Sequence, residues 1–241
     1  MTSEENIHSE SNNTWTLVTR RRRRAISALS YIPQATYSSS RVRTPSPWTP
    51  TDSSADPERE SKLLRRMQSS IRRLEKSRFF RRFLCRMRSP LIQECLDKLL
   101  VSCSRIQIVA YGIGSIESYE VPRLQLALAI LLMQELGVRV AGSIEVFDPI
   151  LSSVECAVVA ALGCTVVSVD EGGRREATVP TLFYMPHCEL VLYDSLLEAN
   201  WKPAMLKRLV VLGNSFGVYE RCANERVGAG SVSLEVQEGM C

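Results

Sequence analysis

Short apolar runs alternate with longer amphipathic segments from residue 106 onward. The apolar runs have the length of strands, and the segments between them have the length of helices. This alternation is typical of a parallel sheet with crossover helices. It predicts an α/β, Rossmann-like fold with a mostly parallel sheet of about five strands and helices on both faces. The expected strands are residues 106–111, 140–147, 165–169, 181–185 and 209–212, and the expected helices are 122–136, 152–162 and 189–197.

Polar residues and glycines stand just after these apolar runs. In an open parallel sheet the carboxyl ends of the strands meet at one edge, and ligands bind there near the topological switch point. We therefore expect these residues to converge. The ligand-binding candidates are Gly112, Gly114, Ser115, Asp148, Glu171, His187, Asn214 and Ser215, and the catalytic candidates among them are His187, Asp148 and Glu171.

The loop after the first expected strand is the segment most similar to a nucleotide-binding motif. Gly112-Ile113-Gly114-Ser115 lacks the third glycine of G-x-G-x-x-G, so it is weak evidence for a dinucleotide site. Asp148 follows Gly114 by 34 residues, whereas the ribose-binding acid usually comes about 20 residues on. A nucleotide or S-adenosylmethionine type of ligand stays an alternative on fold analogy.

Two further loops carry groups that can do chemistry. His187 stands beside Cys188, but neighbours in sequence usually point apart, so we expect a buried cysteine and a histidine free for proton transfer or loop bracing. Arg174 and Arg175 either clamp an anion or pair with nearby acids. We expect Trp201 to be a core anchor.

Length, charge and cysteines narrow the class of protein. The 241 residues, 45% of them hydrophobic, allow one α/β domain and a sizeable additional segment. The basic character belongs to the first 105 residues, which carry a net charge of +11, and the rest carries −7. Eight cysteines without a C-x-x-C pair predict reduced thiols, mostly core fillers, and no metal site. The N-terminus does not resemble a secretory signal, and we expect no membrane segment.

The first 56 residues are rich in Ser, Thr, Pro and Arg, which predicts a disordered basic tail. The Thr-Pro and Ser-Pro pairs at positions 44–50 fit proline-directed phosphorylation or plain linker composition. A nuclear import signal, a nucleic-acid contact and a solvated tail all fit the arginine run. The run is Arg20, Arg21, Arg22, Arg23 and Arg24.

Residues 57–105 predict a basic amphipathic helical segment. Asp56-Pro57 is a helix N-cap followed by proline at the first position, and Ser89-Pro90 begins a second helix. The segment docks on the following domain or binds nucleic acid, an anionic membrane or a calmodulin-like partner. The apolar stripe is Leu64, Met67, Ile71 and Leu74, and the other faces carry Arg65, Arg66, Arg72, Arg73 and Lys76.

Five blocks of residues 111–220 resemble the SRR1-like domain family, named for sensitivity to red light reduced. The blocks are YGIGSIESYEVPRLQLALAILL, IEVFDPILSSVE, LGCTVVSV, PTLFYMPHCELVLYDSLLEANW and LVVLGNSFGVYE. The resemblance covers roughly residues 60–220 and suggests a plant member, whereas residues 227–241 match no block. The matching residues are Gly112, Gly114, Ser115, Ser118, Gln125, Asp148, Glu171, Pro186, His187, Asn200, Trp201, Asn214 and Ser215.

The resemblance implies a regulator of circadian-clock input and phytochrome signalling, present in nucleus and cytoplasm and acting through protein partners. It brings no established catalytic activity and no known cofactor. The alternative is an enzyme or small-ligand sensor, for a nucleotide, S-adenosylmethionine or heme, using the polar edge. Direct nucleic-acid binding by the basic first part is less favoured because the folded part is acidic. We expect the domain to span residues 106–221 and a C-terminal tail to span 222–241.

Overall fold

The computed structural model describes residues 44–52, 54–101, 103–217 and 219. They belong to one unit, which begins at Val42. The arginine run at residues 20–24 and the tail predicted for residues 222–241 lie outside the described residues.

Within the described residues, five parallel strands form the central sheet in the order β4-β3-β2-β6-β7. Counted along the chain this order is 3-2-1-4-5, the order of a doubly wound α/β sheet. The predicted α/β class with a five-stranded parallel sheet is confirmed. The strands are β2 (Gln107–Tyr111), β3 (Glu145–Phe147), β4 (Thr165–Val166), β6 (Thr181–Met185) and β7 (Leu209–Gly213).

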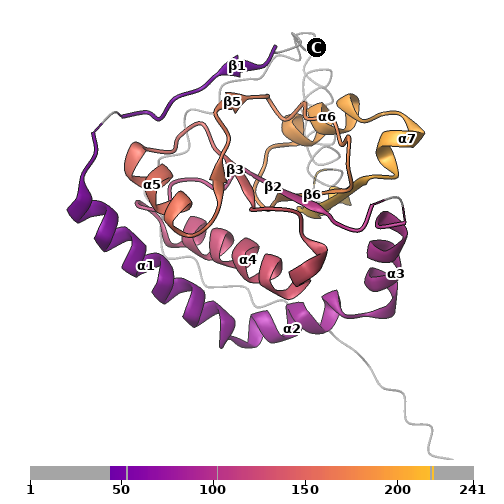
Figure 1. Cartoon of the computed structure of the whole chain (residues 1–241), viewed down its shortest axis with the longest axis horizontal. Helices are drawn as coiled ribbons and strands as arrows, with labels where there is room; N and C mark the ends of the chain where they lie inside the picture. The colour runs from indigo at the N-terminus through magenta and orange to yellow at the C-terminus, as the bar shows by residue number, and fades with distance from the viewer. Residues whose placement is uncertain (1–43, 53, 102, 218, 220–241) are drawn as a thin grey trace, which may run out of the picture. The chain divides into compact units, whose positions relative to one another are not determined.

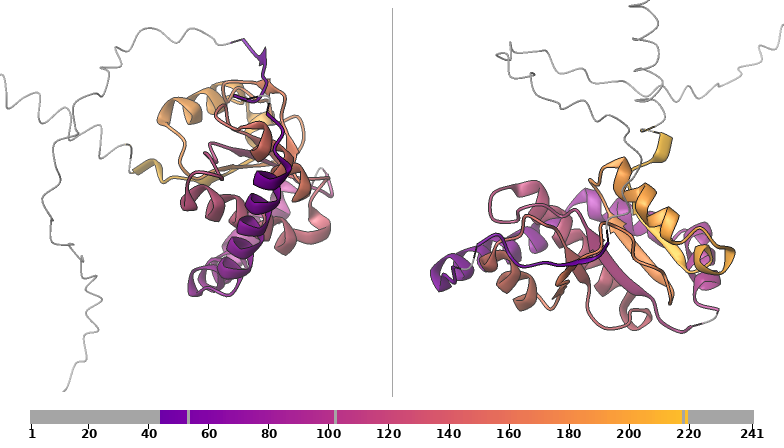
Figure 2. Two further views of the ribbon diagram at one scale, coloured as in Figure 1. Left: turned by 90° about the vertical axis from the view of Figure 1, so that its left-hand side faces the viewer. Right: turned by 90° about the horizontal axis from the view of Figure 1, so that it is seen from above.

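Helices cover both faces of this sheet (Figures 1 and 2). Along β2, Ile108 and Ala110 belong to the apolar cluster shared with the first helices, whereas Val109 and Tyr111 belong to the cluster under α6. Side chains alternate between the faces of a strand, so β2 is buried on both. The helices of the domain are α4 (Glu120–Leu136), α5 (Ser153–Ala161), α6 (Leu190–Ala199) and α7 (Pro203–Leu206), with a short 3₁₀ turn, η1 (Gly137–Arg139).

Three basic helices precede the sheet: α1 (Pro57–Glu75), α2 (Arg78–Met87) and α3 (Pro90–Leu99). The Asp56 side chain caps α1 by accepting hydrogen bonds from the amides of Glu58 and Arg59, as the sequence predicts. The apolar stripe of α1 packs on α4 and α5, with Met67 and also Leu63 fully buried. The stripe therefore serves the core of this unit.

Residues 44–52 form an extended strap, although their composition predicted part of a disordered tail. β1 (Ser46–Pro47) pairs antiparallel with β5 (Val169–Asp170). The Trp48 ring packs edge-on against Phe147 with 5.4 Å between centroids, and the Ser153 amide donates to the Asp52 carboxylate at 2.8 Å. The Trp48 ring buries apolar surface against the domain, which the Ser and Pro residues around it cannot do.

The long apolar helix α4 lies in the core. By length and composition the stretch Glu120–Arg139 would be able to cross a membrane. In the fold, however, Leu126, Ala129 and Leu132 of α4 are fully buried and α1 packs against the helix. Its apolar character is explained by this position.

Several predicted details are wrong. The strand expected at 140–147 is reduced to β3, because Gly142 adopts a φ of +71° and turns the chain. Trp201 is 70% exposed and is not a core anchor. Of the described cysteines, Cys164 and Cys188 are buried and Cys156 packs partly buried against the core, but Cys85, Cys95 and Cys103 are exposed, so core filling explains only half of them.

Candidate functional site

The carboxyl edge of the sheet lies where the chain leaves β2 and β6, the adjacent strands at the switch point. The loop after β2 leads to α4 on one face, and the loop after β6 leads to α6 on the other. A crevice between such diverging loops is the usual ligand site of an open α/β sheet. The structure places Gly112, Gly114, Asp148, His187 and Asn214 at this edge.

The glycine loop after β2 is held by Asp148. Gly112 and Gly114 have φ of +67° and +80°, which side-chain-bearing residues rarely adopt. The Gly114 amide donates to Asp148 Oδ2 at 2.7 Å, and the Ile150 amide donates to Asp148 Oδ1 at 3.1 Å. Both oxygens of this buried carboxylate therefore bind the protein's own backbone.

Ser115, the next predicted residue, binds a carboxylate that the sequence analysis missed. Its hydroxyl donates to Glu155 Oε1 at 2.7 Å, and the Glu117 amide donates to the same oxygen at 2.9 Å. Glu155 Oε2 accepts from the Ser152 amide at 2.9 Å, completing a capping box at the start of α5. The Ser-x-x-Glu spacing of Ser152 and Glu155 was the signal that would have located it.

Glu171 lies in a second cluster, at the start of the loop that follows β5. It accepts a hydrogen bond from the Tyr111 hydroxyl and one from Arg175 Nε at 3.0 Å. Arg175 also pairs with Glu145, and Arg174 pairs with Glu198. Burial, followed by the bond to Glu171, raises the pKa of Tyr111. Both arginines thus pair with acidic side chains of the protein itself. Of the two interpretations given from the sequence, this is pairing with nearby acids and not clamping of an anion.

The loop after β6 separates His187 from Cys188. His187 is exposed, whereas Cys188 is buried, with its thiol 3.4 Å from the Tyr111 carbonyl oxygen. Burial, with a smaller contribution from the Asp148 charge, raises the pKa of Cys188 to about 12. A thiol of this pKa is not a nucleophile at neutral pH. The geometry does not form a thiolate–imidazole pair.

The loop after β7 is held by two tyrosines. The Tyr193 hydroxyl donates to the Met185 carbonyl and accepts from the Asn214 amide at 2.9 Å. The Asn214 side chain donates to the Tyr219 hydroxyl at 2.9 Å, which in turn donates to the Cys188 carbonyl at 2.7 Å. Ser215 stays exposed. This network, which the sequence analysis did not foresee, joins the loops after β6 and β7.

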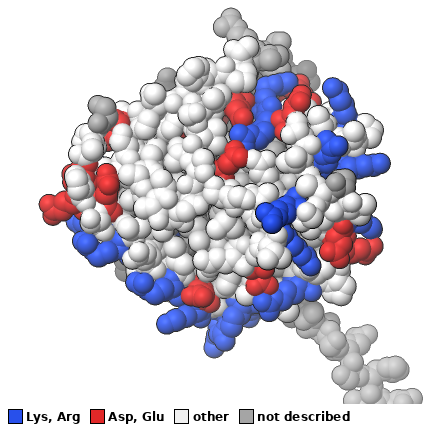
Figure 3. Space-filling model, viewed as in Figure 1, with Lys and Arg blue, Asp and Glu red and all other residues white. Residues whose placement is uncertain are grey.

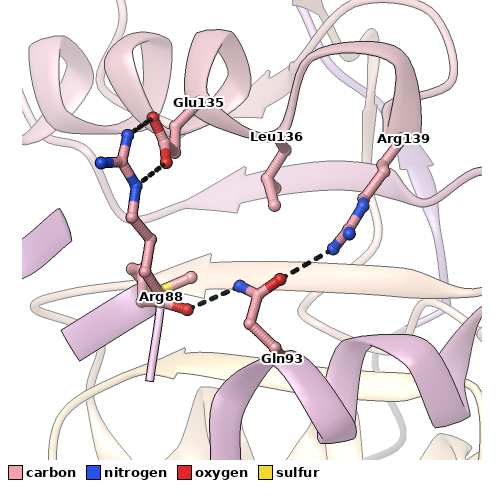
Figure 4. Close-up of a pocket in the computed structure, with 6 residues that line it drawn as sticks. Arg88, Gln93, Glu135, Leu136 and Arg139 are labelled. Carbon is pink, nitrogen blue, oxygen red and sulfur yellow. Dashed lines mark hydrogen bonds and ion pairs between the residues drawn. The ribbon is translucent and has the colours of Figure 1, made fainter. Parts of the chain in front are cut away.

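A cavity of about 250 Å³ lies away from this edge, among α2, α3 and the end of α4 (Figure 4). Arg88 pairs with Glu135 through two hydrogen bonds, of 2.6 and 2.9 Å. Arg139 donates to Gln93 at 3.1 Å. The polar groups that line the cavity mostly bind one another. They hold the helices together and are not free to bind a ligand. Among the described residues, no three His, Cys, Asp or Glu side chains gather as metal ligands.

Comparison with known proteins agrees with the blocks found in the sequence. The SRR1 domain matches residues 92–235, so the match also reaches into residues 227–241, where the sequence analysis found no block. The chain is 45% identical to the Arabidopsis thaliana protein SENSITIVITY TO RED LIGHT REDUCED 1 over 190 residues, which are 75% of this chain and 69% of that protein. The chain belongs to the SRR1 family.

Animal proteins share shorter parts of this SRR1 chain. An SRR1-like protein of Mus musculus is 40% identical over 127 residues, which are 52% of this chain and 51% of the mouse protein. An SRR1-like protein of Drosophila melanogaster is 39% identical over 70 residues, which are 29% of this chain and 25% of the fly protein. The chain thus spans about half and a quarter of the two animal relatives. No solved structure matches it.

Proposed function

We propose that this SRR1 family member is a regulator of red-light signalling that acts by binding other proteins. The observation that carries the proposal is the identity of 45% over 190 residues with an Arabidopsis protein named for reduced sensitivity to red light. The finer parts of the proposal are input to the circadian clock, a link to phytochrome signalling and an effect on clock-gene expression.

The chemistry of the sheet edge supports action through partners. Asp148 and Glu171, two of the three catalytic candidates, are occupied by backbone amides and by neighbouring side chains. A binding crevice normally offers a few polar groups whose partners come from the ligand. Here the same groups hold loops in place, which suits a scaffold.

The experiment is complementation of an Arabidopsis line that lacks its own copy of the relative. The full-length chain is expected to restore growth inhibition by red light, and a clock-gene reporter in the same line tests the rhythm. A double variant, His187→Ala with Asp148→Asn, is expected to restore both responses, because Asn keeps an acceptor for the Gly114 amide and loses only the bond from the Ile150 amide. If the double variant folds but does not restore the responses, the polar groups of the edge are needed for function and the proposal is contradicted.

The location in nucleus and cytoplasm is a separate part of the proposal. The basic run at residues 20–24 is the import signal that we propose. A fluorescent fusion lacking these five residues is expected to lose nuclear signal. An unchanged nuclear fraction would assign import to another segment or to a partner.

A further inference from the structure

The outward face of α1 and α2 carries a band of cations. Figure 1 shows the two helices end to end along one side of the unit, and Figure 3 shows blue side chains gathered along that rim. All of these cations are exposed, and within the described residues none takes part in an ion pair. They are Lys62, Arg65, Arg72, Lys76, Arg78, Arg81, Arg82 and Arg86.

The arginines that point toward the domain behave differently. Arg59 reaches Glu117 at 2.7 Å, Arg88 reaches Glu135 at 2.6 Å, and Arg73 pairs with Glu120. The bond to its arginine lowers the pKa of Glu117, and the corresponding bond lowers the pKa of Glu135. Holding α1 and α2 on α4 therefore uses the inward arginines. The outward cations have no such structural task.

An aromatic ring lies among the outward cations. Phe79 is 57% exposed, between Arg78 and Arg82 on the same helix, and its ring centroid is 6.4 Å from that of Phe83. Arginine and aromatic residues are enriched at protein interfaces and dominate their binding energy. The contact with Phe83 leaves more than half of the Phe79 side chain exposed and open to a partner.

The band has the width of one helix and the length of a peptide segment. With a rise of 1.5 Å per residue, Lys62 to Lys76 spans about 21 Å and Arg78 to Arg86 about 12 Å. The pairs to Glu117, Glu120 and Glu135 set carboxylates beside α1 and α2, along the side of α4. A nucleic-acid duplex is wider than one helix and would bring its phosphates over these carboxylates. A single acidic segment is narrow enough to lie along the outward cations without covering these carboxylates.

We propose that the outward face of α1 and α2 is the docking surface for an acidic segment of a protein partner. The segment would carry Asp or Glu every three or four residues along about 20 residues, with one apolar side chain over Phe79. Charge complementarity of this kind speeds association and selects the partner. The inference rests on the proposed function in one respect, namely that the regulator acts by binding proteins.

The test uses the full-length chain and a labelled 20-residue peptide of Glu with one central Leu, followed by fluorescence anisotropy. Arg78→Glu with Arg82→Glu is expected to weaken binding at least tenfold, and Phe79→Ala about threefold. Lys202→Glu with Lys207→Glu, two exposed lysines beside α7, changes the net charge equally and is expected to leave affinity within twofold. Equal losses in the two charge-reversed proteins would overturn the docking surface.

Other occupants are separate arms of the same experiment. A 20-base-pair DNA duplex, a 20-nucleotide RNA and vesicles containing phosphatidylserine replace the peptide at 150 mM salt. The wild-type and variant chains share the basic run at residues 20–24, so a difference in affinity between them is assigned to α2. The proposal is overturned if any of these ligands binds more tightly than the peptide and loses that affinity in the Arg78→Glu, Arg82→Glu variant.

Failure of the docking surface is distinguishable from failure of the proposed function. A wild-type chain that binds the peptide but does not restore the red-light response overturns the function and leaves the surface intact. If the wild-type chain restores the response and the Arg78→Glu, Arg82→Glu variant restores it equally, the proposed docking surface is overturned.

Discussion

The carboxyl edge of the sheet and the outward face of α1 and α2 use their polar groups in opposite ways. At the edge, Asp148 and Glu155 are bound by amides and a hydroxyl of the same chain, and in the second cluster Glu171 is bound by Tyr111 and Arg175. On the helices, eight exposed cations point to solvent with no ion pair among the described residues. A buried charge must be satisfied within the fold, whereas an exposed charge is free to meet a partner.

Polar groups at an expected ligand edge do not by themselves form a ligand site. Asp148, which suggested ligand binding from the sequence, keeps the glycine loop in place, and Glu155, which the sequence analysis missed, keeps the start of α5 in place. Whether a polar group is free for function depends on the partners it already has.

The largest expected contrast is in thiol reactivity, between Cys188 at the edge and Cys85 on α2. Cys85 is exposed, whereas the raised pKa of Cys188, about 12, leaves about one thiolate in ten thousand at pH 8. Iodoacetamide with peptide mass spectrometry is expected to label Cys85 in the native protein at least a thousandfold faster than Cys188. Rapid native labelling of Cys188 would show an open, reactive edge. Labelling in denaturant, where both should react, is the control.

Glu155→Ala is expected to lower the free energy of unfolding by about 4 kcal/mol. The substitution leaves the amides of Glu117 and Ser152 and the Ser115 hydroxyl without their acceptor. The melting temperature should fall by about 10 °C. Calorimetry checks this, with the exposed Glu176→Ala as the control expected to stay within about 0.5 kcal/mol. Near-native stability of Glu155→Ala would mean that the edge carboxylates are not structural.

Gly112→Ala tests how closely the loops after β2 and β6 approach each other. A Cβ at this position would lie 2.7 Å from Cys188 Sγ, and the φ of +67° is unfavourable for alanine. The two effects together should cost about 3 kcal/mol of unfolding free energy. Gly163→Ala shares the strained φ of +82° but has open space around it, so denaturant titration should show a smaller loss. Equal losses would exclude close packing of the two loops.

Arg59→Ala gives the smallest effect and a dependence on pH. The hydrogen bond from Arg59 lowers the pKa of Glu117 in the folded state, so its contribution is present above the unfolded pKa and is lost as the pH falls through the folded one. Wild type should therefore melt slightly above Arg59→Ala at pH 7, with the gap closing below about pH 4. A gap that is constant from pH 7 to pH 3 would assign the effect to packing.

Much of the fold was predictable because it rests on local patterns. The capping residues Asp56 and Pro57, the apolar stripe around Met67 and the continuous strand β7 each follow from a few neighbouring residues. The alternation of strands and helices predicts a parallel sheet, but the order of its strands was not predicted. Predicting these elements required no knowledge of distant contacts.

The site was less predictable because its interactions are long-range. Glu155 meets Ser115 across 40 residues, and Trp48 donates to the Pro149 carbonyl across 101. Nothing in the sequence near Trp48 or Trp201 shows that the first is packed and the second exposed. Likewise, the arginines of α1 and α2 divide into paired and free only once α4 is in place beside them.

Complementation of the Arabidopsis line with two variants side by side tests the central claim most directly. One carries His187→Ala and Asp148→Asn at the sheet edge, and the other carries Arg78→Glu and Arg82→Glu on α2, with both confirmed to fold by their melting temperatures. We predict that the edge variant restores the red-light response and that the α2 variant does not. Restoration by the α2 variant together with failure of the edge variant would contradict the account and return the function to the edge.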